Sequence, residues 1–181
     1  MNISNHPTKF CADRLEQREN SDFANIWKIL DQVQDPEIPV LSLWDLGVLT
    51  NINKQNDQVV VTITPTYSGC PAVDAMRDDI ISILRKNGID GAIVKTQLSP
   101  AWSSSWLSPE GRKKLTEYGI APPNPTICGK KNIGYIVKHE VRCPNCNSNK
   151  THQVSEFGST ACKALYQCDN CQEPFDYFKT L

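Results

Sequence analysis

The chain has 181 residues, of which 39% are hydrophobic and 22% charged, and its 19 basic and 20 acidic residues leave a net charge of −1. This balance gives no overall attraction to nucleic acid or to an anionic membrane, and no apolar run approaches the roughly 20 residues of a membrane span. The first 20 residues also lack the apolar core of a signal peptide, so we expect a cytoplasmic protein with one ordinary domain and a small appended one.

Residues 1–20 are polar and aperiodic, and we expect a disordered tail that includes Cys11. From residue 21, apolar residues at three-and-four spacing predict a helix, which must end before Pro36 because proline disfavours helical geometry at the preceding residue. Asp35 and Glu37 then flank that proline. Such a pair usually marks a solvated turn, and a role in metal or partner contact is the alternative.

The centre of the first domain has the pattern strand, helix, strand. The β-branched residues 59–64 predict a strand, the apolar spacing over 73–84 predicts a helix that stops near Asn87-Gly88, and residues 92–98 predict another strand. Two strands joined through a helix lie parallel if they share a sheet. The sequence therefore predicts an α/β domain over residues 21–120, built on a small mixed sheet.

Cys70 lies where the strand of residues 59–64 gives way to the helix. Pro71 suits the first helical position, which would place Cys70 at or next to the N-cap. Unpaired backbone N–H groups and the helix dipole favour a thiolate there, so the position predicts a lowered pKa and a functional thiol. The alternative is a small buried hydrophobic residue that closes the turn.

The end of the first domain carries Trp102 and Trp106 in a serine-rich loop. Both rings belong either to the core, as most tryptophans do, or to a partner surface. Ser108-Pro109 then predicts the start of a short helix. The proline-rich residues 121–136 predict a semi-rigid linker before a second module over residues 137–181.

This second module contains two CxxC pairs, Cys143 with Cys146 and Cys168 with Cys171. Two such turns supply the four corners of a tetrahedral thiolate site, typical of a structural zinc ribbon, and a mononuclear iron site is the alternative. Four protein ligands leave no open position for catalysis, and about 45 residues form too small a core without a metal. Its basic and acidic residues balance, so no nucleic-acid partner is expected.

Two further cysteines lie outside this ligand set. Cys162 is a spare thiol, either packed, redox-active or a transient metal ligand, and packing is the default interpretation. Cys128, in the linker, has no spacing that argues for ligation.

Several motifs resemble the small α/β family associated with iron–sulfur cluster assembly and metal–sulfur cluster biosynthesis, and within it the accessory subunits of bacterial phenylacetyl-CoA epoxidase systems. They are DPEIPVLSLWDLG at 35–47, the segment 64–71 with its Cys-Pro pair, SPAWSSSW at 99–106, YGIAPP at 118–123 and FGSTACKA at 157–164. The first 20 residues take no part in the resemblance.

The resemblance implies an accessory role in maturing the multicomponent monooxygenase, through its iron–sulfur reductase or its diiron oxygenase, and not an enzyme of its own. It also implies that Cys70 is the functional thiol, with Asp35 and Glu37 near it, and that a transient iron ion or iron–sulfur cluster is the cargo. Because a lone thiolate cannot hold a cluster, a homodimer that pairs two Cys70 residues, or help from Cys162, is a further hypothesis.

Two other functions compete with this one. A nucleophilic enzyme would need a base near Cys70, and the histidines (His6, His139 and His152) all lie outside the first domain's core sequence. A purely structural subunit of the oxygenase complex would leave Cys70 packed.

Overall fold

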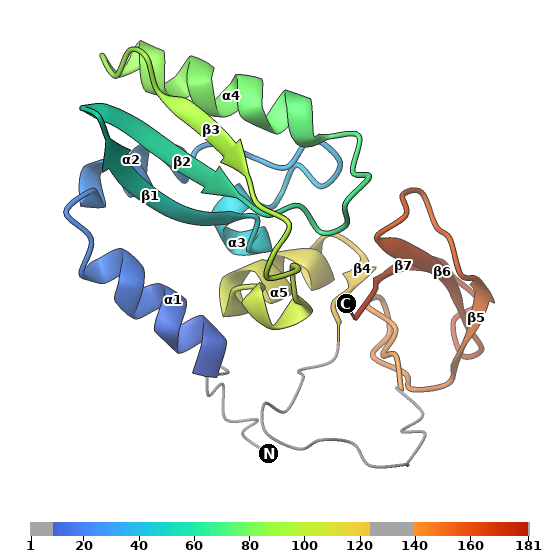
Figure 1. Ribbon diagram of the computed structural model, residues 1–181. Coiled ribbons are helices and arrows are strands. Elements are labelled where there is room, and N and C mark those ends of the chain that lie inside the picture. The colour runs from blue at the N-terminus through green and yellow to red at the C-terminus, as the bar shows by residue number, and fades with distance from the viewer. Residues whose placement is uncertain (1–8, 124–139, 181) are drawn as a thin grey trace.

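The computed structural model describes residues 9–123 and 140–180, with side chains from residue 13 onward (Figure 1). It contains a three-stranded sheet in the order β1-β2-β3 and a four-stranded sheet in the order β4-β7-β6-β5. The first sheet belongs to an α/β domain and the second to a C-terminal ribbon. The predicted fold class, a small mixed sheet with helices followed by a four-cysteine ribbon, is confirmed.

In the first sheet, β1 (Leu49–Gln55) and β2 (Gln58–Ile63) form an antiparallel hairpin. Its two turn residues have φ values of 47° and 65°, as a tight hairpin turn requires. Helix α4 (Val73–Lys86) then crosses over to β3 (Ile93–Thr96), which pairs with β2 in parallel. The strand–helix–strand prediction is therefore confirmed.

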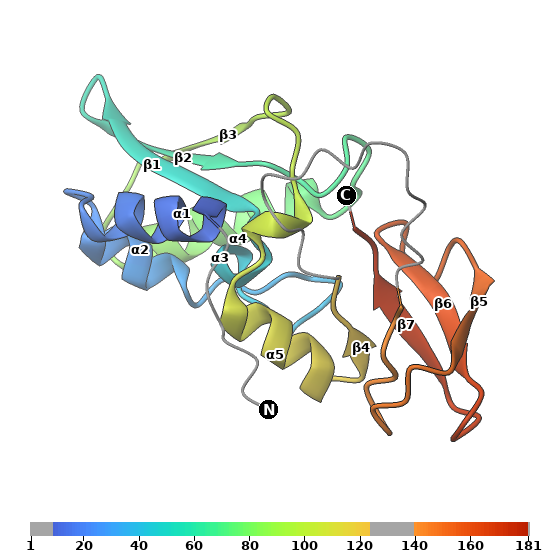
Figure 2. The same cartoon turned by 90° about the horizontal axis from the view of Figure 1, so that it is seen from below.

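Five further helical segments complete this domain. They are α1 (Lys9–Glu19), α2 (Ala24–Leu30), α3 (Leu43–Leu46), the 3₁₀ turn η1 (Ser104–Trp106) and α5 (Pro109–Glu117). Helices α2 and α4 contact each other on one side of the sheet (Figure 2). None of the described helices combines the length and apolar character that a membrane span needs.

Helix α1 corrects the expectation of a disordered tail for residues 9–19, whereas residues 1–8 lie outside the described part of the chain. The buried Arg14 guanidinium donates hydrogen bonds to the carbonyl oxygens of Trp106, Leu49 (3.1 Å) and Trp44 (3.3 Å). It also lies 4.2 Å from the centroid of the Trp44 ring, within cation–π range. Hydrophobic periodicity does not register a helix that is held by a long cationic side chain, which is why the sequence pattern missed it.

The ribbon consists of β5 (Thr151–Ser155), β6 (Lys163–Cys168) and β7 (Pro174–Phe178), paired antiparallel. The short β4 (Ile120–Ala121), at the end of the first domain, adds to the edge of β7 in parallel. The predicted linker therefore begins inside a strand of the ribbon sheet. Most of that linker, including Cys128, lies outside the described residues.

The ribbon is docked on the first domain through shared core residues. Phe178 is fully buried in the first domain's core, with its ring centroid 5.8 Å from that of Trp102. Ala121 of β4 is buried in the ribbon's own core. Each module thus completes the hydrophobic core of the other.

Both tryptophans of the serine-rich loop belong to the core, with Trp102 4% and Trp106 8% exposed. The Trp102 indole N–H donates to the carbonyl oxygen of Leu46 (3.2 Å). The partner-surface interpretation of this pair is wrong, because both rings are buried in the core cluster of the first domain, where Trp102 also contacts Phe178 of the ribbon.

Asp45 is a buried carboxylate within an otherwise apolar stretch. Its oxygens accept hydrogen bonds from the Lys114 ammonium (2.6 Å) and the Ser108 hydroxyl (2.7 Å). Burial opposes ionisation, but the bonds from Lys114 and Ser108 outweigh it and lower the pKa of Asp45. These contacts tie α3 to the start of α5, where the Ser108 hydroxyl also accepts from the Gly111 N–H.

Replacing this carboxylate, Asp45→Asn, is expected to lower the free energy of unfolding by about 1.5–3 kcal/mol at neutral pH, the usual worth of hydrogen bonds to a charged group. A carboxylate with a lowered folded pKa stabilises above its unfolded pKa and loses that effect as pH falls through the folded value. The difference between wild type and variant should therefore shrink on acidification. Denaturant titrations at several pH values measure it, and a difference independent of pH would contradict the assignment.

Candidate functional site

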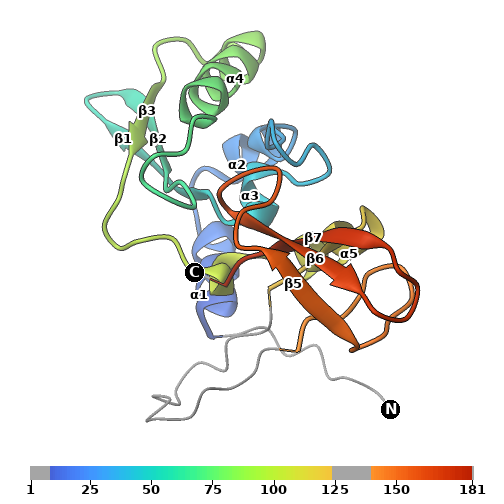
Figure 3. The same ribbon diagram turned by 90° about the vertical axis from the view of Figure 1, so that its right-hand side faces the viewer.

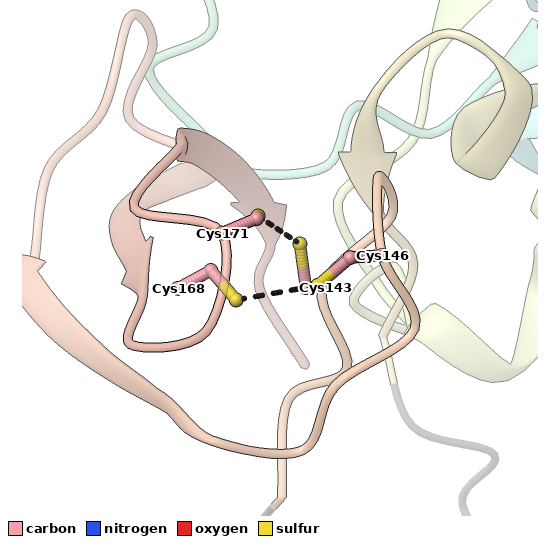
Figure 4. A group of neighbouring side chains, drawn as sticks. All are labelled: Cys143, Cys146, Cys168 and Cys171. Carbon is pink, nitrogen blue, oxygen red and sulfur yellow. Dashed lines mark hydrogen bonds between the residues drawn. The ribbon is translucent and has the colours of Figure 1, made fainter.

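The four ribbon cysteines converge on one point (Figure 4). Their sulfur atoms all lie within 4.8 Å of one another, with Cys143 and Cys171 3.8 Å apart and Cys146 and Cys168 3.5 Å apart. A disulfide would bring two sulfurs to about 2.05 Å, so these are free thiols. Four thiolates at ~2.3 Å from a tetrahedral ion lie about 3.8 Å apart, so the donor set fits zinc.

The electrostatics of these thiols also favour a cation. The Ser148 backbone N–H is the main cause that lowers the pKa of Cys146 to about 6. Although the Glu173 backbone N–H favours the Cys171 thiolate, burial and the neighbouring sulfurs raise its pKa to about 12. Ionising one sulfur thus disfavours ionising the next, and a divalent ion among them removes that conflict. The ribbon is a metal-binding module.

Cys70 lies in the loop between β2 and α4, but not at the N-cap. Helix α4 begins at Val73 with Ala72 as its N-cap residue, so Cys70 precedes the cap by two residues. Its N–H donates to the carbonyl oxygen of Tyr67 (3.2 Å), and its own carbonyl accepts from Val73 (3.4 Å). The sulfur is therefore held in a turn ahead of the helix, and the residue is 9% exposed.

The prediction of a lowered pKa at Cys70 is wrong. Burial raises the pKa of this thiol above its ordinary value, and the carboxylates of Glu37 and Asp35 raise it further, against a hydrogen bond from the Ala72 backbone. The helix-dipole argument failed because it ignored the rest of the fold, which surrounds the sulfur with apolar and acidic groups. Cys70 is thus a neutral thiol and not the thiolate that the helix dipole would favour.

The two motif acids differ in their surroundings. Asp35 is 4% exposed, and its Oδ1 accepts the backbone N–H groups of Glu37 (2.9 Å) and Ile38 (2.8 Å). This carboxyl group therefore shapes the loop, although burial raises its pKa. Glu37 is only partly buried, and burial together with the charge of Asp35 raises its pKa as well.

This difference predicts unequal effects of substitution at position 35. Asp35→Asn keeps an oxygen that accepts both N–H groups and should leave stability nearly unchanged, whereas Asp35→Ala should cost about 1–2 kcal/mol. Thermal unfolding of the two variants beside wild type tests this. Equal losses in both variants would show that the charge of Asp35, and not its acceptor geometry, supports the loop.

Cys162, although it belongs to the ribbon, is buried in the same region as Cys70 and the two motif acids. It is 4% exposed and belongs to the first domain's core cluster together with Cys70, and its thiol lies 3.0 Å from the Thr160 hydroxyl. Burial raises its pKa, and the charges of Glu37 and Asp35 also contribute. The default interpretation, a packed thiol, agrees with this burial, but its neighbours are the motif residues of the other domain.

Sequence reasoning missed two members of this group. Tyr67 bonds to the Cys70 thiol, and burial, Cys70, Glu37 and Cys162 all raise its pKa. Lys163 is only 5% exposed, and its Nζ lies 3.8 Å from Asp176. Tyr67 lies three residues before Cys70, and Lys163 directly follows Cys162, so each is close in sequence to a candidate thiol. Nothing in the sequence indicated that the loops carrying the two thiols lie side by side in the fold.

Comparison with known proteins matches a separate family model to each of the two modules. A family model described as "Iron-sulfur cluster assembly protein" matches residues 24–94, and one described as "PaaD zinc beta ribbon domain" matches residues 134–179. A domain of unknown function (DUF59) from Bacillus anthracis, of known structure, aligns with a TM-score of 0.47 and 22% identity over 57% of this chain and 95% of that one.

Two relatives are similar in sequence. An "Fe-S protein maturation auxiliary factor" of Porphyromonas gingivalis (strain ATCC BAA-308 / W83) is 33% identical over 93 residues, which is 50% of this chain and 88% of that protein. An Escherichia coli (strain K12) protein whose proposed name makes it a subunit of 1,2-phenylacetyl-CoA epoxidase is 48% identical over 156 residues, 86% of this chain and 92% of the relative. Identity at this level over nearly the whole relative means that the chain belongs to the PaaD family of phenylacetyl-CoA epoxidase subunits.

Proposed function

We propose that this chain is an accessory protein of a phenylacetyl-CoA epoxidase that serves the assembly of iron or iron–sulfur centres, and that Cys70 is the thiol that carries the metal. The role is supported by the names of the two relatives and by the iron–sulfur assembly model over the first domain. The observation that carries the assignment of Cys70 is the grouping of this buried thiol with the motif acids Asp35 and Glu37.

The chemistry of this group suits transport better than catalysis. A thiol that is neutral when empty does not react readily with stray electrophiles, because the thiolate is the nucleophile. It becomes a ligand when a thiophilic cation displaces its proton, and the neighbouring carboxylates favour the approach of that cation. The other epoxidase subunits, the reductase or the oxygenase, are the partners that would receive the metal.

The ribbon has a separate role in this proposal. Its four thiols fit a tetrahedral zinc ion, and the matched family model is described as a zinc ribbon. All four positions are then filled by protein, so this zinc holds the ribbon folded and takes no part in transfer. The cytoplasmic location and the homodimer considered above stay predictions.

The test is to co-express the epoxidase subunits with the wild-type chain, with Cys70→Ala, or without the chain. We expect Cys70→Ala to reproduce the absence of the chain, with loss of iron from one purified epoxidase component and of epoxidase activity. The component that loses iron identifies the client. The variant must be folded, which its circular dichroism and ribbon metal content establish.

Two other results would contradict the proposal. Full epoxidase activity and iron content with a folded Cys70→Ala variant would favour a structural subunit without thiol chemistry. Turnover of a thioester by the purified chain, abolished by the same substitution, would instead favour a nucleophilic enzyme.

A further inference from the structure

The loop between β5 and β6 crosses from the ribbon to the first domain. In Figures 1 and 3 it lies beside the loop that joins β2 to α4, so Cys162 of one module and Cys70 of the other belong to neighbouring loops. Both thiols are buried in one hydrophobic cluster, and the charge of Cys162 affects the ionisation of Cys70. Cys162 is not part of the ribbon's four-sulfur group.

The position of Cys162 is fixed by the docked ribbon. The backbone N–H of Lys179 donates to its carbonyl oxygen (3.0 Å), and the Lys179 ammonium donates to the adjacent carbonyl of Ala161 (2.9 Å). Phe178, the neighbour of Lys179, is locked against Trp102 of the first domain. Contacts that hold the ribbon in place therefore also hold this thiol next to the Cys70 loop.

The charges around the two thiols favour a cation between them. Glu37 interacts with both thiols, and Asp35 adds a second carboxyl group. The buried Lys163 ammonium interacts with this group, but Asp176 lies 3.8 Å from it and offsets part of its charge. Because both thiols are neutral, the balance is set by three carboxyl groups (Asp35, Glu37 and Asp176) against the single ammonium group of Lys163, and this excess of acidic groups favours a cation.

We propose that Cys70 and Cys162 together bind one thiophilic divalent cation, Fe²⁺ as cargo, with Glu37 as the third ligand. This inference rests on the proposed function and deepens it, because the ribbon then supplies half of the transfer site. Binding forms two metal–sulfur bonds and releases one proton from each thiol, with no change of oxidation state. One chain is then sufficient, and pairing of two Cys70 residues across a dimer is not needed.

The site differs from the ribbon centre in a way that suits release. Among the described residues, only the four ribbon cysteines already form a group within shared ligand distance. Cys70, Cys162 and Glu37 are not such a preformed group, so they should bind an ion less tightly than the ribbon cysteines do. Three ligands also leave a coordination position through which a client thiolate can enter.

The test is an anaerobic titration of the full, zinc-loaded chain with Co²⁺, whose bonds to thiolates give a charge-transfer absorption. Cys11→Ala and Cys128→Ala form the background, so that these two thiols contribute nothing. In this background we compare Cys70→Ser, Cys162→Ser and the double variant, since serine preserves size and hydrogen bonding. Zinc content and near-ultraviolet circular dichroism confirm that each variant is folded and its ribbon docked.

We expect each single substitution to weaken Co²⁺ binding at least about tenfold, since even a partner that only orients a ligand is worth that much, and the double variant to be little worse than either. Glu37→Gln should weaken binding while leaving the charge-transfer band. If Cys162→Ser binds like the parent while Cys70→Ser does not, the shared site is wrong and the proposed role of Cys70 stands. If neither substitution matters, the proposed function fails as well.

Discussion

Removal of the ribbon metal is expected to unfold residues 140–180 while the first domain keeps its secondary structure. The ribbon's own core is small, so most of its stability must come from the metal. Its buried members are Ala121, Val141, Cys143, Ala164, Cys168, Phe175 and Tyr177. Binding of a structural zinc ion typically supplies on the order of 10 kcal/mol to such a module.

Cys168→Ser is the sharpest version of this experiment, because this cysteine is fully buried and lies at the end of β6. Hydrogen exchange should show loss of protection across β5, β6 and β7, and Trp102 fluorescence should change as Phe178 leaves it. Cys162→Ser is the matched control, because this buried cysteine of the same ribbon is not one of the four ribbon ligands, and the variant should retain the ribbon metal. A metal-free ribbon with native exchange protection would contradict the structural role.

Gly47→Ala is expected to destabilise the first domain by at least about 3 kcal/mol, since it combines an unfavourable backbone conformation with a steric clash. Gly47 ends α3 with a φ of 81°, in the left-handed region. A Cβ there would lie 2.7 Å from the Trp106 Cβ and 2.9 Å from its carbonyl oxygen. Relieving this clash would require the backbone at Trp106 to shift, and the carbonyl oxygen of Trp106 also accepts a hydrogen bond from Arg14.

Gly88→Ala separates the two contributions. Gly88 also has a positive φ, 77°, but a Cβ there meets nothing within 4 Å. Gly88→Ala should therefore lower the free energy of unfolding only by the cost of a left-handed backbone conformation, about 1–2 kcal/mol. Urea denaturation of both variants measures the difference, and equal losses would show that the close approach at Gly47 is relieved by small shifts.

Local patterns predicted much of this structure. The strand of residues 59–64, the helix after Cys70 and the ribbon ligand spacing each depend on neighbours within a few turns of chain, and periodicity and spacing register such features directly. Ser108 at the start of α5 is a further example, because its side chain accepts the Gly111 N–H as a capping residue should.

Features that depend on distant contacts were missed or mistaken. Helix α1 is held by Arg14 across the tertiary structure, and the pKa of Cys70 is controlled by burial and by acids from another loop. The burial of Cys162 and Cys70 in one core cluster depends on how the two modules dock, and residue spacing within either module does not encode that docking. A local electrostatic rule at a helix start is thus overridden when the fold buries the group.

The parallel pairing of β4 with β7 has a consequence for biosynthesis. β4 leaves the ribosome about fifty residues before its partner strand, so the newborn first domain displays an open strand edge and an uncovered Trp102 until the ribbon arrives. Unpaired strand edges can pair with other chains, although an edge of only two residues limits this. If the ribbon does not fold without its metal, β4 stays unpaired and Trp102 stays uncovered by Phe178, so a shortage of metal during synthesis should prolong the exposure of both.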